Sequence, residues 1–341
     1  MPKKDIVVIG ASAGGIEALR TLVAALPGDF PASLFIVLHS GPDSPGILDV
    51  ILQRAGTLPT SSAKDKERIL PGHIYVAPPD RHLLIEPERI CLSRGPKENR
   101  FRPAVDPLFR SAAQVYGPRV IGVILTGGLD DGTAGLWAIK QLGGTAIVQD
   151  PQDALVPSMP ASALRHVKVD HCVPLTEIAP LLVQLTSTHL ADEEGIYEVL
   201  EHLDIEVKIA KQDPAIDQDV RDLWDKSSYT CPECHGVLLQ LEENGRERFR
   251  CHTGHAFSAD SLLAYLTEGV EDSLWTTIRT IEESVLLMRH MAKHVKDSNG
   301  SAAEEFQKKA DEAFRRSELV RKAVSAHEEL NVERIVESSE T

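Results

Sequence analysis

The sequence predicts an α/β protein built on a doubly wound, mostly parallel β-sheet. From residue 5 to about residue 185, short β-rich runs alternate with stretches of helical spacing. Several of the β-rich runs are apolar throughout, as in VIGVIL at 120–125, which is typical of strands buried on both faces. Together these two observations predict helices on both sides of a parallel sheet.

The expected elements follow one another in a regular order. The strands are expected at 6–10, 33–39, 73–78, 83–92, 119–127, 144–150 and 171–175. Helical spacing lies between several of them, at 16–26, 44–55, 107–116, 133–142 and 161–166. We therefore expect one α/β domain over residues 1–185.

Three further segments follow this domain. Residues 186–228 contain twelve acidic and only four basic residues, which is typical of a solvated linker with a short helix. Residues 229–257 form a compact module rich in cysteine and histidine, with an Asn-Gly hairpin turn. Residues 258–341 have helical spacing in two stretches, which predicts either an αα-hairpin that packs on itself or a coiled-coil seam for a partner.

Composition excludes several classes of partner and location. The formal net charge of -15 argues against nucleic acid or an anionic membrane surface as the main partner, because both require a basic face. No apolar run approaches the roughly 20 residues of a membrane helix, so no membrane insertion is expected. The start MPKKDIVVIG does not resemble a signal peptide, and the expected location is the cytoplasm.

The segment IVVIGASAGGIEALRTL at 6–22 is a strand, a glycine turn and a helix. Such a turn either cradles a phosphate or presents a nucleophile in a G-x-S-x-G elbow. A dinucleotide site requires an acidic residue at the end of the second strand, where His39 stands, and no lysine of the G-K-[ST] type follows the glycines. The turn therefore favours display of Ser12.

Two more reactive side chains follow strand ends. His39 ends the run SLFIVLH, and Asp131 comes just after RVIGVILTG. A serine hydroxyl becomes a nucleophile when an imidazole takes its proton and a carboxylate orients that imidazole. Singly, these residues are also typical of a helix cap, a polar strand end and a turn. Their coincidence at the carboxyl edge of one sheet predicts a catalytic triad of Ser12, His39 and Asp131.

Six blocks follow one another along the chain: IGASAGGIEAL, LFIVLH, YVAPPDRHL, RPAVDPLFRSAA, VILTGGLDDGTAG and PSMPASAL. Together, in this order, they resemble the catalytic domain of the CheB-type chemoreceptor glutamate methylesterases. The resemblance implies a parallel doubly wound fold and hydrolysis of glutamate methyl esters on the cytoplasmic helices of methyl-accepting chemoreceptors, with release of methanol. Many members also deamidate receptor glutamines. It implies Ser12, His39 and Asp131 as the triad, and no cofactor for catalysis.

The match departs from the family at three points. Gly128 stands where the family often has methionine; its backbone N–H is implied as one oxyanion donor, and the N–H of Ala13 is expected as another. Asp130 replaces the usual asparagine, and we expect this carboxylate to raise the basicity of His39 or to disturb the hydrogen bonds of Asp131. Only nine residues precede Gly10, which implies a stand-alone form lacking the receiver domain.

Three arginines lie in the family-like blocks, and two roles are open for them. Arg81, Arg102 and Arg110 either guide an acidic receptor helix toward the site or form structural salt bridges.

The cysteine-rich module has the spacing of a zinc ribbon. Cys231, Cys234, Cys251 and His255 come from two knuckles at one end of a β-hairpin, and His252 is a spare for His255. With four protein ligands the zinc would be structural, and such a small hairpin has little core of its own. The other interpretation is a metal-free hairpin with free thiols.

Two functions are therefore predicted from the sequence. The first is a serine esterase that acts on receptor glutamate methyl esters through an acyl-enzyme, with glutamine deamidation as a second activity. The alternative is a non-catalytic signalling scaffold on the same fold. In either case the C-terminal helices are candidate contacts for other chemotaxis-like signalling proteins.

Overall fold

The computed structural model describes residues 3–188, 201–212, 224–243 and 245–326. The chain divides into two compact units, Met1–Ser261 and Leu262–Thr341. Among the described residues, no helix is both long and apolar enough to cross a membrane.

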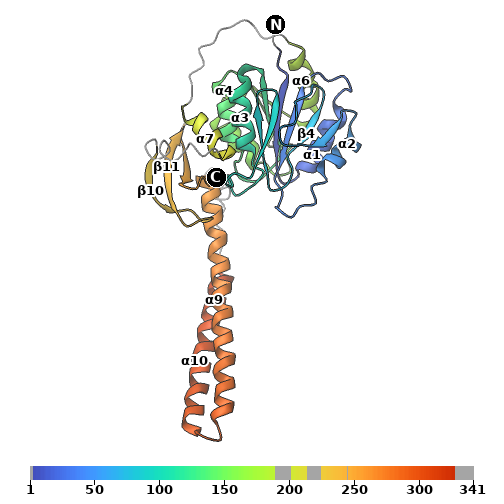
Figure 1. The fold of residues 1–341 in the computed structure, drawn as a ribbon. Coiled ribbons are helices and arrows are strands. Elements are labelled where there is room, and N and C mark those ends of the chain that lie inside the picture. The colour runs from blue at the N-terminus through green and yellow to red at the C-terminus, as the bar shows by residue number, and fades with distance from the viewer. Residues whose placement is uncertain (1–2, 189–200, 213–223, 244, 327–341) are drawn as a thin grey trace. The chain divides into compact units, whose positions relative to one another are not determined.

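A seven-stranded parallel sheet forms the centre of the first unit (Figure 1). Its strand order is β3-β4-β2-β1-β7-β8-β9. The strands are β1 (Ile6–Ala11), β2 (Ser33–Leu38), β3 (Thr60–Ser62), β4 (Ile74–Val76), β7 (Val120–Ile124), β8 (Thr145–Gln149) and β9 (His171–Val173). The order reverses at β1, which pairs with both β2 and β7, so the carboxyl ends of these three strands are neighbours. The predicted doubly wound parallel sheet is confirmed.

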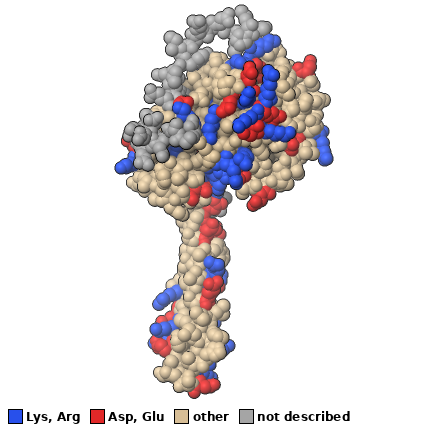
Figure 2. Space-filling view, viewed as in Figure 1, with Lys and Arg blue, Asp and Glu red and all other residues tan. Residues whose placement is uncertain are grey.

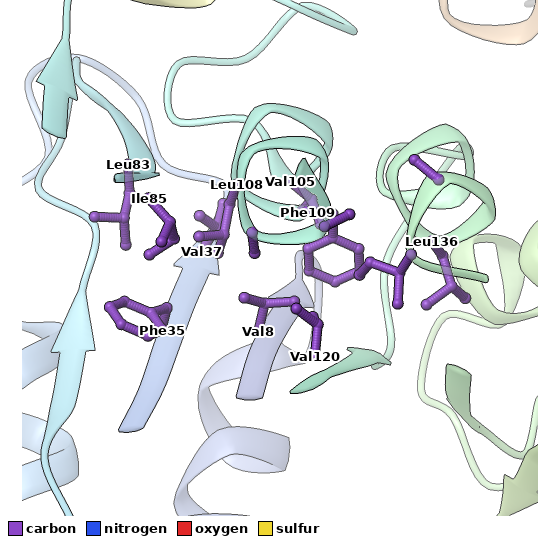
Figure 3. Packing of buried hydrophobic residues seen from close by; sticks show 14 of the residues in the cluster. Val8, Phe35, Val37, Leu83, Ile85, Val105, Leu108, Phe109, Val120 and Leu136 are labelled. Carbon is purple, nitrogen blue, oxygen red and sulfur yellow. The ribbon is translucent and has the colours of Figure 1, made fainter. Parts of the chain in front are cut away.

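Helices cover both faces of this sheet. One face packs against α1 (Gly15–Ala25), α2 (Leu48–Ala55) and α6 (Leu175–Ser187). The other packs against α3 (Val105–Tyr116), α4 (Thr133–Gln141) and α5 (Ser158–His166). Consecutive residues of β1 alternate between the two cores, because side chains of a strand point to opposite faces. Figure 3 shows Val8 of the sheet beside Phe109 of α3, and Phe35 of the sheet near Ile85.

Two details differ from the expected strands. The run 83–92 is a separate antiparallel hairpin, β5 (His82–Glu86) and β6 (Arg89–Ser93), rather than one strand. The chain turns at Pro87 and Glu88, and Glu88 has a φ of 60°, which interrupts an extended chain. The short strand β3 was not predicted, since its polar sequence Thr-Ser-Ser lacks the apolar character of a central strand.

The segment after the sheet is more structured than a solvated linker. Residues 189–200 and 213–223 lie outside the described part, but α7 (Glu201–Lys211) packs its apolar side into the core beside α3. Glu206 on this helix is 2% exposed, so the expectation of a solvated acidic stretch is wrong for this residue.

The cysteine-rich module belongs to a four-stranded antiparallel sheet within the first unit. Its strands, in spatial order, are β10 (Asp225–Thr230), β11 (Val237–Glu243), β12 (Arg246–Cys251) and β13 (Ala256–Ser258). Of the expected Asn-Gly turn between β11 and β12, Asn244 lies outside the described residues and Gly245 has a φ of 72°.

The second unit is a helical hairpin made of most of α9 (Ala259–Val295) and of α10 (Gly300–Ser325). The Asn299 side chain caps α10 by accepting a hydrogen bond from Ala302 N at 3.1 Å. Ion pairs Arg289–Asp311 and Arg321–Glu282 join the antiparallel helices, and Figure 2 shows both charges along them. The αα-hairpin prediction is confirmed.

Candidate active site

Ser12 lies in a sharp turn between β1 and α1. Ser12 N donates a hydrogen bond to Thr126 O at 3.0 Å, and Ser12 O accepts one from Gly15 N at 2.8 Å. Gly14 has a φ of 77°, and a Cβ atom there would lie 2.9 Å from a Leu155 side-chain carbon. The turn thus requires glycine at 14, and it leaves Ser12 half-buried at the start of the helix.

His39 leaves the neighbouring strand at the same edge of the sheet. Ala11 and Leu38 are register partners in the parallel pair β1–β2, and His39 N donates to Ala11 O at 3.2 Å. Ser12 and His39 therefore follow paired residues of adjacent strands. Both line a hollow of about 620 Å³ that is open to solvent.

His39 is paired with Asp131 and stacked on Phe101. The distance from His39 Nε2 to Asp131 Oδ2 is 2.7 Å, and both side chains are 2% exposed. The rings of His39 and Phe101 are 3.8 Å apart and nearly parallel at 6°. Because a carboxylate only accepts, Nε2 donates in this hydrogen bond, and the buried Nδ1 has no partner among the described residues. The expected hydrogen bond between Ser12 and His39 is not formed.

Asp131 is surrounded by hydrogen-bond donors. Besides His39, the donors are Val105 N at 2.7 Å, Asn99 Nδ2 and Gly132 N, both at 2.9 Å, and Asp106 N at 3.3 Å. Burial by itself raises the pKa of Asp131, but the hydrogen bond and charge of His39 and these further donors lower the pKa to about 2. Asp131 is therefore ionised throughout the range in which an imidazole titrates.

A second buried acid, Asp106, shares Asn99 with Asp131. Asn99 Nδ2 donates to Asp106 Oδ2 at 3.0 Å, and Gly135 N donates to Asp106 Oδ1 at 2.7 Å. Burial and the neighbouring charge of Asp131 raise the pKa of Asp106 to about 7. Of the two acids, Asp131 thus holds its negative charge more firmly.

Asp130 is hydrogen-bonded to the cysteine-rich sheet. Its carboxylate accepts hydrogen bonds from Arg246 Nη2 at 2.6 Å and from Ser258 Oγ at 2.7 Å, and its exposure is 4%. The described contacts of Asp130 include neither His39 nor Asp131. The carboxylate is instead engaged by strand β12 and the end of β13, and no described hydrogen bond of Asp131 is made to it.

The loop that carries Asp131 runs directly beside Ser12. A Cβ atom placed on Gly127 would lie 2.8 Å from Ser12 Cβ, so only a glycine backbone fits there. The Gly127 N–H is already used, by Val156 O at 2.9 Å. The N–H groups of Ala13 and Gly128 have no acceptor among the described residues, which keeps both free for an oxyanion.

Arg81, Arg102 and Arg110 were expected either to guide a receptor helix or to form structural salt bridges, and two of them form structural ion pairs. Arg110 is 2% exposed and pairs with Glu98, which is equally buried. Arg102 Nε donates to Asp80 Oδ1 at 2.8 Å. Arg81 is exposed.

Asn99 and Phe101 were not predicted as site residues. They lie in the loop RGPKENRF, which has no periodicity and precedes the block that resembles the family. A polar loop before a helix gives no signal of its own, so the sequence alone did not distinguish these two residues from ordinary loop residues.

The structure also brings the four predicted metal ligands together. One ligand atom each of Cys231, Cys234, Cys251 and His255 lies within 4.8 Å of the others. The spare, His252, is exposed and packs over Gly236 instead.

Comparison with known proteins supports the same reading of residues 5–185. The family model described as CheB methylesterase matches residues 7–182. A Leptospira interrogans protein, provisionally named protein-glutamate methylesterase/protein-glutamine glutaminase, is 43% identical over 187 residues, which are 54% of this chain and 97% of that protein. The crystal structure of the Thermotoga maritima CheB methylesterase catalytic domain is similar with a TM-score of 0.52 and 36% identity, covering 54% of this chain and 100% of that one.

Other relatives are longer than the matched region. A Geobacter metallireducens protein named protein-glutamate methylesterase/protein-glutamine glutaminase 1 is 42% identical over 182 residues, which are 51% of this chain and 49% of that protein. The chain thus spans about half the length of this relative.

Proposed function

The chain belongs to the CheB methylesterase family, and from this premise we propose that it hydrolyses methyl esters of glutamate side chains on chemoreceptor helices, releasing methanol. The observation that carries the proposal is the 2.7 Å hydrogen bond between His39 and Asp131 at the rim of the hollow that Ser12 also lines. We also propose deamidation of receptor glutamines, since both reactions pass through the same glutamyl ester of the serine. The cytoplasm is the proposed location, because the receptor helices lie there.

In the proposed mechanism, His39 Nδ1 removes the proton of Ser12 while the Ser12 oxygen attacks the ester carbonyl. The resulting imidazolium donates through Nε2 to Asp131, which is ionised because its pKa is about 2. His39 then passes the proton to the departing methanol oxygen. Water attacks the acyl-enzyme with His39 again as the base, which frees the glutamate carboxylate and restores Ser12.

A small rearrangement precedes this reaction, because the Ser12–His39 hydrogen bond is not formed without substrate. Catalytic hydrogen bonds often tighten only when substrate is bound. In the proposal the Ser12 side chain moves, since the imidazole is held by Asp131 and Phe101. The N–H groups of Ala13 and Gly128 are the proposed donors to the oxyanion.

The shape of the hollow supports a helix as substrate. It is open to solvent, so a side chain on a protein surface can reach Ser12 without unfolding of its own backbone. Its walls include the apolar side chains of Ile16, Leu38 and Phe101, which can pack against the methylene groups and methyl ester of a modified glutamate.

The test is an assay of methanol release from methylated receptor, with wild type, Ser12→Ala and Ser40→Ala. Ser40 is the matched control, because it lines the same hollow. We expect the rate to fall by several orders of magnitude in Ser12→Ala and to stay close to wild type in Ser40→Ala. Equal rates for wild type and Ser12→Ala would refute the esterase mechanism and favour the scaffold alternative.

Labelling by a serine-directed phosphonate gives an independent check. We expect one label per chain on the peptide that contains Ser12. A label on another serine would assign a different nucleophile.

A further inference from the structure

The four-stranded sheet β10–β13 ends in two turns of similar hydrogen bonding. In the first, Cys231 N donates to Gly236 O and His235 N to Cys231 O, both at 2.7 Å. In the second, Cys251 N donates to His255 O at 3.0 Å and Gly254 N to Cys251 O at 2.9 Å. Each turn therefore presents a pair of soft or borderline ligands, and the two pairs face one another.

The spacing of the ligand atoms matches a tetrahedron. The Sγ atoms of Cys234 and Cys251 are 3.6 Å apart, and His255 Nδ1 lies 3.5 Å from Cys251 Sγ and 3.8 Å from Cys231 Sγ. At tetrahedral angles, ligands at about 2.0 to 2.3 Å from a central zinc are separated by about 3.5 Å for a nitrogen and a sulfur and by about 3.8 Å for two sulfurs. These three spacings are therefore close to those around a bound Zn²⁺.

A disulfide does not explain the cluster. All three cysteines are free thiols, and the 3.6 Å between Cys234 and Cys251 is far longer than the roughly 2.05 Å of an S–S bond. Cys231 and Cys251 are buried, at 0% and 1% exposure. Convergence of three thiols and an imidazole on one point is costly for a hairpin unless a cation neutralises the thiolates.

We propose that Cys231, Cys234, Cys251 and His255 bind one structural Zn²⁺ ion, and that this ion holds the sheet against the loop that supports Asp131. Three thiolates and one imidazole suit zinc, and four protein ligands leave no position open for chemistry on the metal. The esterase reaction needs no metal, so the role of the ion is to stabilise structure. This inference stands independently of the esterase activity.

The link to the catalytic loop starts at His255. Directly after this ligand, Ala256 N donates to Lys97 O at 3.2 Å and Ala256 O accepts from Asn99 N at 2.8 Å. Lys97 also forms a 2.9 Å ion pair with Glu233, between the first two cysteines. The loop 97–99 is therefore attached to both metal-binding turns.

Ser258 continues the link. Its N–H donates to Asn99 Oδ1 at 3.1 Å, and its hydroxyl donates to Asp130 Oδ1 at 2.7 Å. Asn99 in turn donates to Asp131. Only two residues separate the metal ligand His255 from Ser258, so loss of the metal frees the segment that holds Asn99 and Asp130 in place.

The metal is tested on the full-length protein by elemental analysis. We expect one zinc per chain in wild type, loss of zinc in Cys234→Ser and in His255→Ala, and retention in His255→Cys, which restores a fourth soft ligand. His252→Ala is the matched control and keeps its zinc. If the variants do not fold, Co²⁺ is added instead to metal-stripped wild type. Strong visible absorption would then show tetrahedral binding by cysteine thiolates.

Wild-type protein that contains no zinc and shows no cobalt–thiolate absorption would overturn the site. Retention of zinc in His255→Ala together with its loss in His252→Ala would overturn the ligand assignment. Both outcomes are independent of any assay of methanol release.

The link to the catalytic loop is tested by amide hydrogen exchange with and without a zinc chelator. We expect faster exchange at 97–101 and 256–258 on zinc removal, and no change in β4, which lies at the far side of the parallel sheet. Unchanged exchange at 97–101 in zinc-free protein would show that the metal stabilises the hairpin alone and would overturn the link.

Discussion

Asn99 donates a hydrogen bond to Asp131 Oδ1 at 2.9 Å, and through this contact the carboxylate that pairs with His39 is joined to the cysteine-rich sheet. The carbonyl oxygen of the same amide accepts from Ser258 N at 3.1 Å. Asn99 has a φ of 48°, a left-handed conformation that asparagine tolerates better than most residues. Both the backbone conformation and the side-chain amide of Asn99 therefore suit its position between Asp131 and Ser258.

Removal of the Asn99 amide is expected to slow the reaction. Asn99→Gly keeps the positive φ available and deletes only the side chain. A hydrogen bond to a charged group contributes about 1.5–3 kcal/mol, so kcat should fall about 10- to 100-fold with little change in KM. Steady-state kinetics on methylated receptor measure this.

Glu88→Gly is the control for Asn99→Gly. Glu88 also has a positive φ, of 60°, but it is exposed in the β5–β6 turn. Its replacement should leave kcat unchanged. An equal fall in both variants would show that flexibility, rather than the lost amide, is responsible.

Asp131→Asn is expected to lower kcat by about 10⁴-fold and to change the pH dependence of stability. The pKa of Asp131 is lowered from 3.8 to about 2, so the folded state favours its ionised form. The resulting contribution, about 2 kcal/mol, is fully present above the unfolded pKa and is lost as the pH falls through the folded pKa.

Urea unfolding at several pH values between about 3 and 7 tests whether the contribution of Asp131 to the free energy of unfolding decreases on acidification. The free-energy difference between wild type and Asp131→Asn should shrink as the pH falls below about 4. A difference that stays constant or grows on acidification contradicts the assignment of Asp131 as the ionised partner of His39.

The parallel sheet and the pairing of His39 with Asp131 could be predicted from the sequence because both rest on local signals. Apolar strands, glycine turns and the reactive residues at strand ends are visible in short stretches, as with Ser12 after IVVIGA. The environment of Asp130 was not predictable, since its partner Arg246 is separated by 116 residues and lies in another sheet. Glu206 was misjudged for the same reason: charge composition alone does not show that three arginines surround it.

The pair Arg246–Asp130 is expected to stabilise the fold. Arg246→Ala leaves the buried carboxylate of Asp130 hydrogen-bonded to the Ser258 hydroxyl but without its arginine, and breaking a buried pair costs about 3–5 kcal/mol. Glu247→Ala, at the exposed neighbouring position, should cost less than about 1 kcal/mol. Denaturant unfolding of both variants compares these costs.

The double variant Arg246→Ala/Asp130→Asn separates the interaction energy of the two side chains from the contacts that each makes with other residues. We expect it to recover part of the stability lost in Arg246→Ala, because no buried charge is left unpaired. Strict additivity of the two single changes would show that the side chains do not interact.

Glu206 is expected to be the most sensitive acidic residue of α7. It lies 2.7 Å from Arg248, 3.0 Å from Arg250 and 3.4 Å from Arg110. Burial by itself raises the pKa of Glu206, but the charges of the arginines lower it well below its usual range. Glu206→Gln therefore leaves buried arginine charge uncompensated, at a cost of about 3–5 kcal/mol in unfolding free energy.

Asp204→Asn on the same helix is the matched control for Glu206→Gln. Asp204 is about half exposed and pairs with Lys208, so its loss should cost no more than about 1 kcal/mol. Equal destabilisation by the two variants, measured by denaturant unfolding, would show that the buried arginines do not depend on Glu206.

Phe101 is expected to orient the catalytic imidazole through its ring face. The rings of Phe101 and His39 are 3.8 Å apart and nearly parallel, and such stacking contributes about 0.5–1.5 kcal/mol beyond burial. Phe101→Leu keeps an apolar side chain but loses the flat surface, so kcat should fall about 2- to 12-fold. Phe101→Tyr retains the ring and should stay near wild type. Kinetics in which Leu and Tyr behave alike would show that Phe101 contributes only apolar wall to the hollow, and that Asp131 alone holds His39 in position.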